Sequence, residues 1–92
     1  MITRIITNHI KPGKKPEYIS VSRDFCAALV ARCGCLEAKV FSDLDSGDVL
    51  NIERWPDRET AEKVTATEVF AEFVPRLAPL FDGNDEVYLE EV

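Results

Sequence analysis

The chain has 92 residues, of which 46% are hydrophobic and 30% are charged. These values are typical of one soluble globular domain, so we expect a single domain over residues 1–92. The net charge is −6 and the densest basic stretch is the pair Lys14-Lys15, which excludes a strongly basic surface for nucleic acid or for an anionic membrane. We find no apolar run of membrane-spanning length and no signal-peptide pattern, and therefore expect a cytoplasmic protein.

The cysteines Cys26, Cys33 and Cys35 are odd in number, so we do not expect a disulfide framework. Cys33 and Cys35 flank Gly34 in a C-x-C arrangement that could chelate a metal. With a single histidine in the chain and no second cysteine pair, the ligand count does not support a metal site. We interpret the two cysteines as small residues beside a glycine that ends a helix.

The first half of the chain predicts a strand, a helix and two further strands. Residues 2–10 are rich in β-branched types and contain neither Gly nor Pro, which indicates a strand. After a turn, Pro16 is well placed as the first residue of a helix whose apolar positions recur at helical spacing as far as residue 32, and Gly34 ends that helix. Strands are then predicted over residues 36–41 and 49–55, joined by a polar turn.

The strand over residues 49–55 carries an unusual set of side chains. Because successive strand residues point to opposite faces, Asn51, Glu53 and Trp55 share one face, while the apolar Leu50 and Ile52 lie on the other. An amide, a carboxylate and the single Trp of the chain therefore meet on one surface. If the chain has a pocket, we expect it there.

The second half begins with Asp57, a good helix N-cap that directly follows Pro56. We expect a break or kink at Pro75, because its ring would clash with a carbonyl one turn earlier. The predicted elements are, in order, a helix over residues 58–66, a second helical stretch over 69–81, a turn at 82–84 and a last strand over 85–92.

The element order β, α, β, β, α, β is the split βαβ pattern of ferredoxin-like α+β folds, with a four-stranded antiparallel sheet. The helices can cover only one face of that sheet, yet the first and third strands carry apolar residues on both faces. We expect a second copy of the chain to cover the other face, which gives a homodimer.

Five short motifs resemble the antibiotic biosynthesis monooxygenase (ABM) superfamily, and the similarity runs over nearly the whole chain. They are Pro12-Gly13-Lys14, Gly34-Cys35-Leu36, Glu53-Arg54-Trp55, Phe70-Ala71-Glu72-Phe73 and Leu77-Ala78-Pro79-Leu80. The resemblance implies a dimeric α+β barrel. It also implies one of several activities: members include cofactor-free oxygenases that convert phenols or quinols into quinones, haem-degrading enzymes and an isomerase of a signal molecule.

In the quinone-forming members an Asn and a Trp four residues apart on the third strand line the cleft, and Asn51 and Trp55 match that spacing. The resemblance therefore implies that these two residues are catalytic, with Phe70 and Phe73 as the apolar wall. Two departures limit the match. Thr67-Glu68-Val69-Phe70 replaces a Ser-x-His-Phe motif, and Thr65 stands where haem-degrading relatives have an iron-ligating His, which argues against a haem role.

Oxygenation without metal or flavin requires an electron-rich substrate that reduces O₂ itself, so the protein need only bind it, deprotonate it and stabilise the developing negative charge. We therefore expect no cofactor and a small aromatic substrate that is phenolic, quinol-like or polyketide-like. Asn51 could donate an N–H to a substrate oxygen, and Trp55 could hold the ring. His9 is a candidate substrate-binding residue or base, because its ordinary pKa lies near neutrality.

Two other functions fit the same residues. The first is a non-catalytic dimeric domain that binds a ligand, since fold does not fix function. The second is an isomerase of a small oxygenated metabolite, which would use His9 and Glu53 for acid and base chemistry rather than Trp55. An empty apolar pocket beside Asn51 would favour the monooxygenase, and a filled core there would favour the binding domain.

Overall fold

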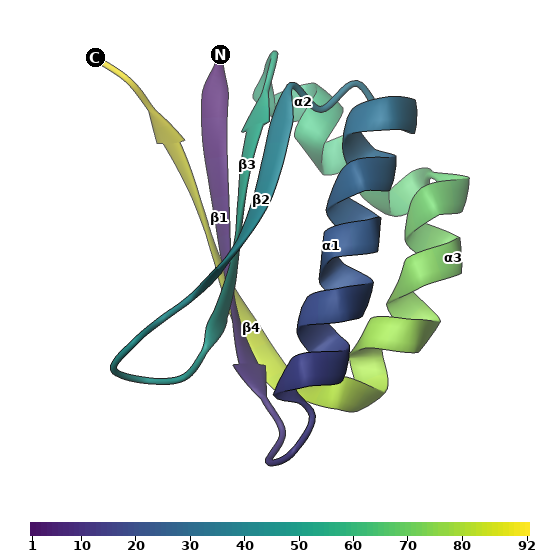
Figure 1. Cartoon of the computed structure of the whole chain (residues 1–92). Helices are drawn as coiled ribbons and strands as arrows, with labels where there is room; N and C mark the ends of the chain where they lie inside the picture. Colours follow the sequence, from purple (N-terminus) through teal and green to yellow (C-terminus); the bar gives the residue numbers. More distant parts are fainter.

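A computed structural model describes residues 1–92 (Figure 1). One sheet forms a layer, and helices pack on one of its faces. The elements are β1 (Ile2–Ile10), α1 (Lys15–Arg32), β2 (Glu37–Ser42), β3 (Val49–Trp55), α2 (Arg58–Glu62), the 3₁₀ helix η1 (Lys63–Ala66), α3 (Glu68–Leu77), the 3₁₀ helix η2 (Ala78–Leu80) and β4 (Phe81–Glu90). The predicted α+β ferredoxin-like fold is confirmed. None of the helices is both long and apolar enough to cross a membrane.

The four strands are antiparallel in the order β2-β3-β1-β4. In this register Glu53 lies opposite Arg4, and Asn51 lies opposite Ile6. Asn51, Glu53 and Trp55 do share a face, and it is the face that the helices cover, because all three are buried. The central pair of strands thus presents polar side chains to the interior.

The two long helices, α1 and α3, lie side by side on that face (Figure 1). Helix α1 has Pro16 in its first turn and is followed by Gly34 at φ +78°, a left-handed conformation that a residue without Cβ adopts at little cost. The core between the sheet and these helices includes Leu29 of α1, Phe73 of α3 and Trp55 of β3. The apolar stripe of each helix therefore meets the inner face of the sheet.

The helical segment after β3 begins as predicted, since the Asp57 carboxylate accepts the backbone N–H of Thr60 at 2.7 Å. A break at Pro75, one of the two predicted alternatives, does not occur: α3 continues through Pro75 to Leu77. Pro75 has no N–H for the carbonyl of Ala71, but it lies only two residues before the helix ends. Few intrahelical hydrogen bonds follow Pro75, so the missing hydrogen bond to Ala71 does not end the helix.

The predicted turn at residues 82–84 is wrong. Strand β4 already begins at Phe81 and pairs with β1 through Asn84, which lies opposite Asn8. The pairing register shifts between Asn8 and Ile10, and Gly83 adopts φ +143° beside this irregularity. A glycine inside a strand is compatible with such a bulge, so pairing with β1 overrides the turn preference of Asp-Gly-Asn.

The opposite face of the sheet has no helix over it (Figure 1). Its central positions are apolar: Ile5 of β1 lies between Ile52 of β3 and Val87 of β4. Phe41, Val87 and Leu89 on this face are exposed. The structure therefore leaves an apolar sheet surface uncovered.

Thr67 is the N-cap of α3, with its Oγ1 accepting the backbone N–H of Phe70 at 3.2 Å and donating to the carbonyl of Val64 at 2.6 Å. We expect Thr67→Ala to lower the free energy of unfolding by about 1 kcal/mol, as loss of such caps does. Thr67→Ser keeps the hydroxyl and should lose much less. Urea unfolding of the two variants checks this, and equal losses would show that the cap contributes nothing.

Candidate functional site

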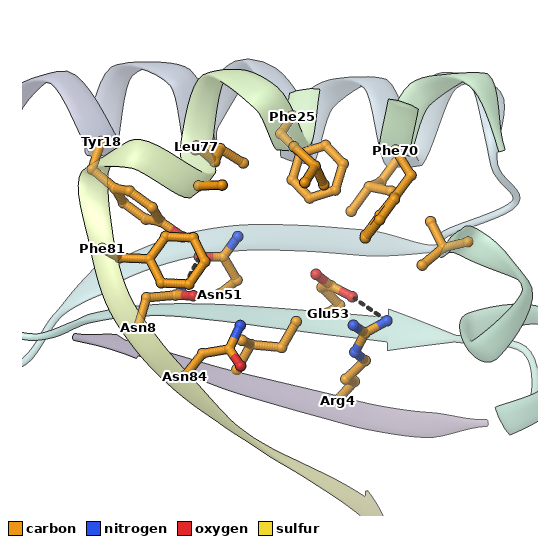
Figure 2. A pocket seen from close by; sticks show the side chains of 15 residues that line it. Arg4, Asn8, Tyr18, Phe25, Asn51, Glu53, Phe70, Leu77, Phe81 and Asn84 are labelled. Carbon is orange, nitrogen blue, oxygen red and sulfur yellow. Dashed lines mark hydrogen bonds and ion pairs between the residues drawn. The ribbon is translucent and has the colours of Figure 1, made fainter. Parts of the chain in front are cut away.

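A cavity of about 150 Å³ lies between the sheet and the helices (Figure 2). Ten of its 15 lining residues are hydrophobic, and the polar ones rise mainly from the sheet. The lining residues are Arg4, Ile6, Asn8, Tyr18, Phe25, Leu29, Asn51, Glu53, Val64, Phe70, Val74, Leu77, Ala78, Phe81 and Asn84. The sheet thus gives the cavity a polar floor and the helices give it an apolar roof.

The amide of Asn51 forms one end of the floor and is only 3% exposed. Its Nδ2 lies 2.9 Å from the Ser22 hydroxyl oxygen and 3.7 Å from the Cys26 sulfur, while its Oδ1 accepts from Asn8 Nδ2 at 3.4 Å. Asn8 also donates to the carbonyl of Val49 at 3.1 Å. Partners on both sides fix the orientation of the Asn51 amide at the cavity.

Glu53 and Arg4 form the other end of the floor (Figure 2). Glu53 is 1% exposed, and its Oε1 accepts the indole N–H of Trp55 at 2.9 Å. Arg4 Nη1 lies 3.9 Å from the same oxygen, while Arg4 Nη2 binds Glu86 at 3.0 Å. Burial raises the pKa of Glu53 above its ordinary value, although the Arg4 charge and the Trp55 hydrogen bond act in the opposite direction.

The roof is aromatic. Phe25 of α1 and Phe70 of α3 lie above Glu53, whereas Tyr18 of α1 and Phe81 of β4 lie beside Asn51, at the other end of the cavity (Figure 2). The rings of Tyr18 and Phe81 pack edge to face with centroids 5.8 Å apart. Burial raises the pKa of Tyr18, so its hydroxyl stays protonated near neutral pH. A flat, apolar ligand fits between such rings and a polar floor.

The exposure of the lining residues shows where the cavity opens. Tyr18, Leu29 and Asn51 are buried, whereas Ala78 and Asn84 are exposed and Val74 and Phe81 are half-buried. The exposed lining residues belong to η2 and β4, and the half-buried ones belong to α3, β4 and, at Ile6, β1. The mouth therefore lies between the end of α3 and the beginning of β4.

The structure brings two of the predicted site residues, Asn51 and Phe70, to the cavity. Trp55 is 0% exposed in the core and reaches the site only through its hydrogen bond to Glu53. Phe73 packs behind the roof, with its ring 5.4 Å from that of Phe25. All four residues lie on the inner face of β3 or on α3, but only Asn51 and Phe70 reach the cavity.

His9 lies outside the cavity, at the far end of β1. Its ring is exposed between two carboxylates, with Nε2 2.9 Å from Asp85 and Nδ1 3.1 Å from Asp48. Hydrogen bonds to Asp85 and then Asp48 raise the pKa of His9. His9 is therefore not among the residues that line the cavity.

Sequence reasoning did not include Arg4, Asn8, Tyr18 or Asn84 among the site residues. The sequence did contain a signal for Arg4 and Asn8. They alternate with Ile2 and Ile6 on one face of a strand, and polar side chains on a core-facing strand face need hydrogen-bond partners. Asn84 carried no signal, because its segment was predicted as a turn.

The structure contains no group of three or more His, Cys, Asp or Glu side chains arranged to hold a metal ion. Cys33 and Cys35 are free thiols beside Gly34. Burial raises the pKa of Cys26 to about 12 and that of Cys35 to about 11. These buried thiols are therefore neutral at physiological pH and are weak nucleophiles.

Arg4→Met removes the cation beside a buried carboxylate. Because folding raises the pKa of Glu53, stability linked to this group is present at low pH and is lost as the pH rises through its folded-state pKa. We expect Arg4→Met to raise that pKa further and to cost about 3–5 kcal/mol of unfolding free energy at pH 8, and less at pH 5. Urea unfolding at both pH values measures this, and adding Glu53→Gln should restore most of the loss. A pH-independent loss would contradict the interpretation.

Comparisons with known proteins agree with this architecture. One antibiotic biosynthesis monooxygenase of known crystal structure is 28% identical, with a TM-score of 0.85 over 100% of this chain and 99% of that one. A Pseudomonas aeruginosa protein is 27% identical, with a TM-score of 0.83 over 99% and 93% of the two chains. A conserved Methanosarcina mazei protein, 19% identical, shares the fold, with a TM-score of 0.84 over 100% and 94% of the chains.

A search of curated proteins finds no match. The model of the family described as antibiotic biosynthesis monooxygenase matches residues 1–76. This chain is therefore a member of the antibiotic biosynthesis monooxygenase family.

Proposed function

We propose that the protein is a cofactor-independent monooxygenase that oxidises a small phenol or quinol with O₂. The observation that supports this most directly is the cavity itself, in which an aromatic roof faces a floor of oriented amide and ionic side chains. Membership of the family points to the same reaction class. A filled core at Asn51 would have favoured the non-catalytic binding domain.

The net reaction converts a phenol with a hydrogen on the carbon opposite its hydroxyl into a quinone, or a quinol with a ring hydrogen into a hydroxyquinone. One atom of O₂ is added to the ring carbon, and the other leaves as water with two hydrogens of the substrate. The substrate supplies all the electrons, so the protein must stabilise its anion and exclude water. An apolar roof and fixed N–H donors at the floor serve these two needs.

Asn51 is the proposed donor to the oxygen that forms during the reaction. One of its two N–H groups faces the Cys26 sulfur at 3.7 Å, and sulfur is a weak acceptor that a substrate oxygen can replace. Phe70, which lines the cavity, is the proposed wall above the ring. We assign Trp55 a positioning role, because its indole N–H is committed to Glu53.

We also propose that the protein is a homodimer that buries the open face of the sheet. Ile5, Ile52 and Val87 are neighbours at the centre of that face, and Phe41 and Leu89 extend the apolar surface. A second copy with the same surface would cover it by two-fold symmetry and complete an α+β barrel. The interface would lie opposite the cavity, so each subunit would keep its own mouth free.

Oxygen consumption by metal-stripped protein tests the activity. With a panel of phenols and quinols we expect uptake that survives chelators, and we expect Asn51→Ala to lower kcat by roughly 10²- to 10³-fold, the usual cost of losing one such donor. Glu72→Ala, on the exposed side of α3, is the control and should match the wild type. Ligand binding without uptake across the panel would instead favour a non-catalytic binding domain.

Sedimentation velocity tests the dimer. Ile5→Glu places a charge at the centre of the open sheet face and should yield a monomer, because burying an unpaired carboxylate is costly. Leu44→Glu adds the same charge in an exposed loop and should leave the dimer unchanged. A wild type that sediments as a monomer at every concentration would refute the proposal.

A further inference from the structure

We infer that Glu53 is the general base of this site and that the substrate is a phenol or quinol with a single ring. The substrate oxygen that Glu53 deprotonates binds beside Arg4. The inference rests on the proposed function and adds to it the proton acceptor and the size of the substrate. It is carried by the spacing of the Arg4–Glu53 pair, by the unused donor capacity of Arg4 and by the cavity volume.

Arg4 and Glu53 form an ion pair without a direct hydrogen bond. The 3.9 Å between Arg4 Nη1 and Glu53 Oε1 is too long for a hydrogen bond, although both side chains are buried. Arg4 Nε is the one buried side-chain nitrogen or oxygen in the chain without a hydrogen-bond partner. A guanidinium has five N–H donors, and a buried one ordinarily uses them. Arg4 Nη1 donates to the carbonyl of Ala61 at 3.4 Å and Nη2 pairs with Glu86, so Arg4, which lines the cavity, has capacity for one more acceptor.

A phenol oxygen supplies that acceptor and conserves the buried charge. The phenol O–H bond breaks, the proton goes to the Glu53 carboxylate, and the electron pair stays on the substrate oxygen. Before the transfer the negative charge beside Arg4 is on Glu53, and afterwards it is on the phenolate. The number of charges in the site is unchanged, so the step avoids the large cost of creating a new buried ion.

The surroundings of Glu53 favour this exchange. Trp55 donates to Oε1 and fixes the carboxylate. The raised pKa of Glu53 makes its carboxylate a better proton acceptor than an exposed glutamate. The other groups that act on Glu53 are Glu86, through Arg4, and the thiols of Cys26 and Cys35, which are neutral below pH 9 because their pKa values are about 12 and about 11.

The size of the cavity limits the substrate to one ring. The cavity volume of about 150 Å³ is the same as that of an engineered apolar cavity in another protein that binds benzene. Asn51 and Glu53 are two residues apart on β3, which places their side chains on the order of 7 Å from each other. One ring with oxygens at opposite ends spans this floor, with the deprotonated oxygen at Arg4 and the new oxygen at Asn51. A fused polycyclic phenol exceeds this volume and would have to extend out through the mouth.

Binding of 4-nitrophenol tests the inference without turnover, because the nitro group withdraws the electrons that O₂ needs and the ionised form alone absorbs visible light. We expect the wild type to bind its ionised form at pH 6 without releasing a proton to the buffer, because Glu53 takes that proton. Glu53→Gln keeps the shape and the acceptor for Trp55 but has no group to take the proton, so any ionised nitrophenol that it binds beside Arg4 should release one proton per molecule to the buffer. Glu72→Gln is the matched control and should behave as the wild type. We expect 4-nitro-1-naphthol, with two rings, to bind at least tenfold more weakly.

With a substrate that the protein oxidises, Glu53→Gln should lower kcat by about 10²-fold or more and change KM by less than tenfold, as loss of a general base does. Glu53→Asp, which keeps a shorter carboxylate, should recover part of kcat and serves if the Gln variant folds poorly. Binding of the neutral form alone by the wild type, or equal proton release by the wild type and Glu53→Gln, would overturn the base assignment even if O₂ uptake is observed. Equal affinity for one and two rings would overturn the size limit.

Discussion

The hydrogen bond from the Trp55 indole to the Glu53 carboxylate is the interaction on which the inner face of the sheet depends. A carboxylate that is 1% exposed requires a donor and a counter-charge, and Trp55 and Arg4 supply them from the same strand and from its neighbour. The antiparallel register makes this possible because it places Arg4 directly opposite Glu53. The sheet can therefore carry an ionic pair toward its helices where a purely apolar layer would otherwise pack.

The same register separates the floor into two chemically different ends. Two residues along β3 from Glu53, Asn51 meets Ser22 of α1 and Asn8 of β1 in a neutral network. A neutral amide end and an ionic end under one aromatic roof suit a ligand whose two ends also differ in charge. Rigid strands hold both ends, so the spacing between them does not depend on loops.

Much of the fold followed from local patterns. The alternation in residues 49–55 correctly placed Asn51, Glu53 and Trp55 on one face, and Asp57 and Gly34 marked helix boundaries as expected. Two departures from the local patterns had the same origin: Pro75 and Asp82-Gly83-Asn84 are strong local signals that tertiary context overrode. Neither the continuity of α3 nor the early start of β4 can be read from residues within a few positions of these signals.

The candidate site was less predictable than the fold. A strand pattern gives the face of a side chain but not its depth, so it could not distinguish Asn51, at the cavity, from Trp55, in the core. The partnership of Arg4 with Glu53 depends on which strands are neighbours, and that is a property of the sheet order. His9 is the complementary case, since its chemistry suits the predicted role but its position on β1 lies outside the cavity.

The position of β4 at the edge of the sheet has a consequence for colloidal behaviour. An edge strand of ten residues exposes backbone groups that can pair with another chain and seed aggregation. Here that strand carries Asp82, Asp85, Glu86 and Glu90, so two such edges approaching each other would bring like charges together. Part of the net charge of −6 thus sits where it discourages uncontrolled strand addition while leaving the apolar face beside it available for an ordered contact.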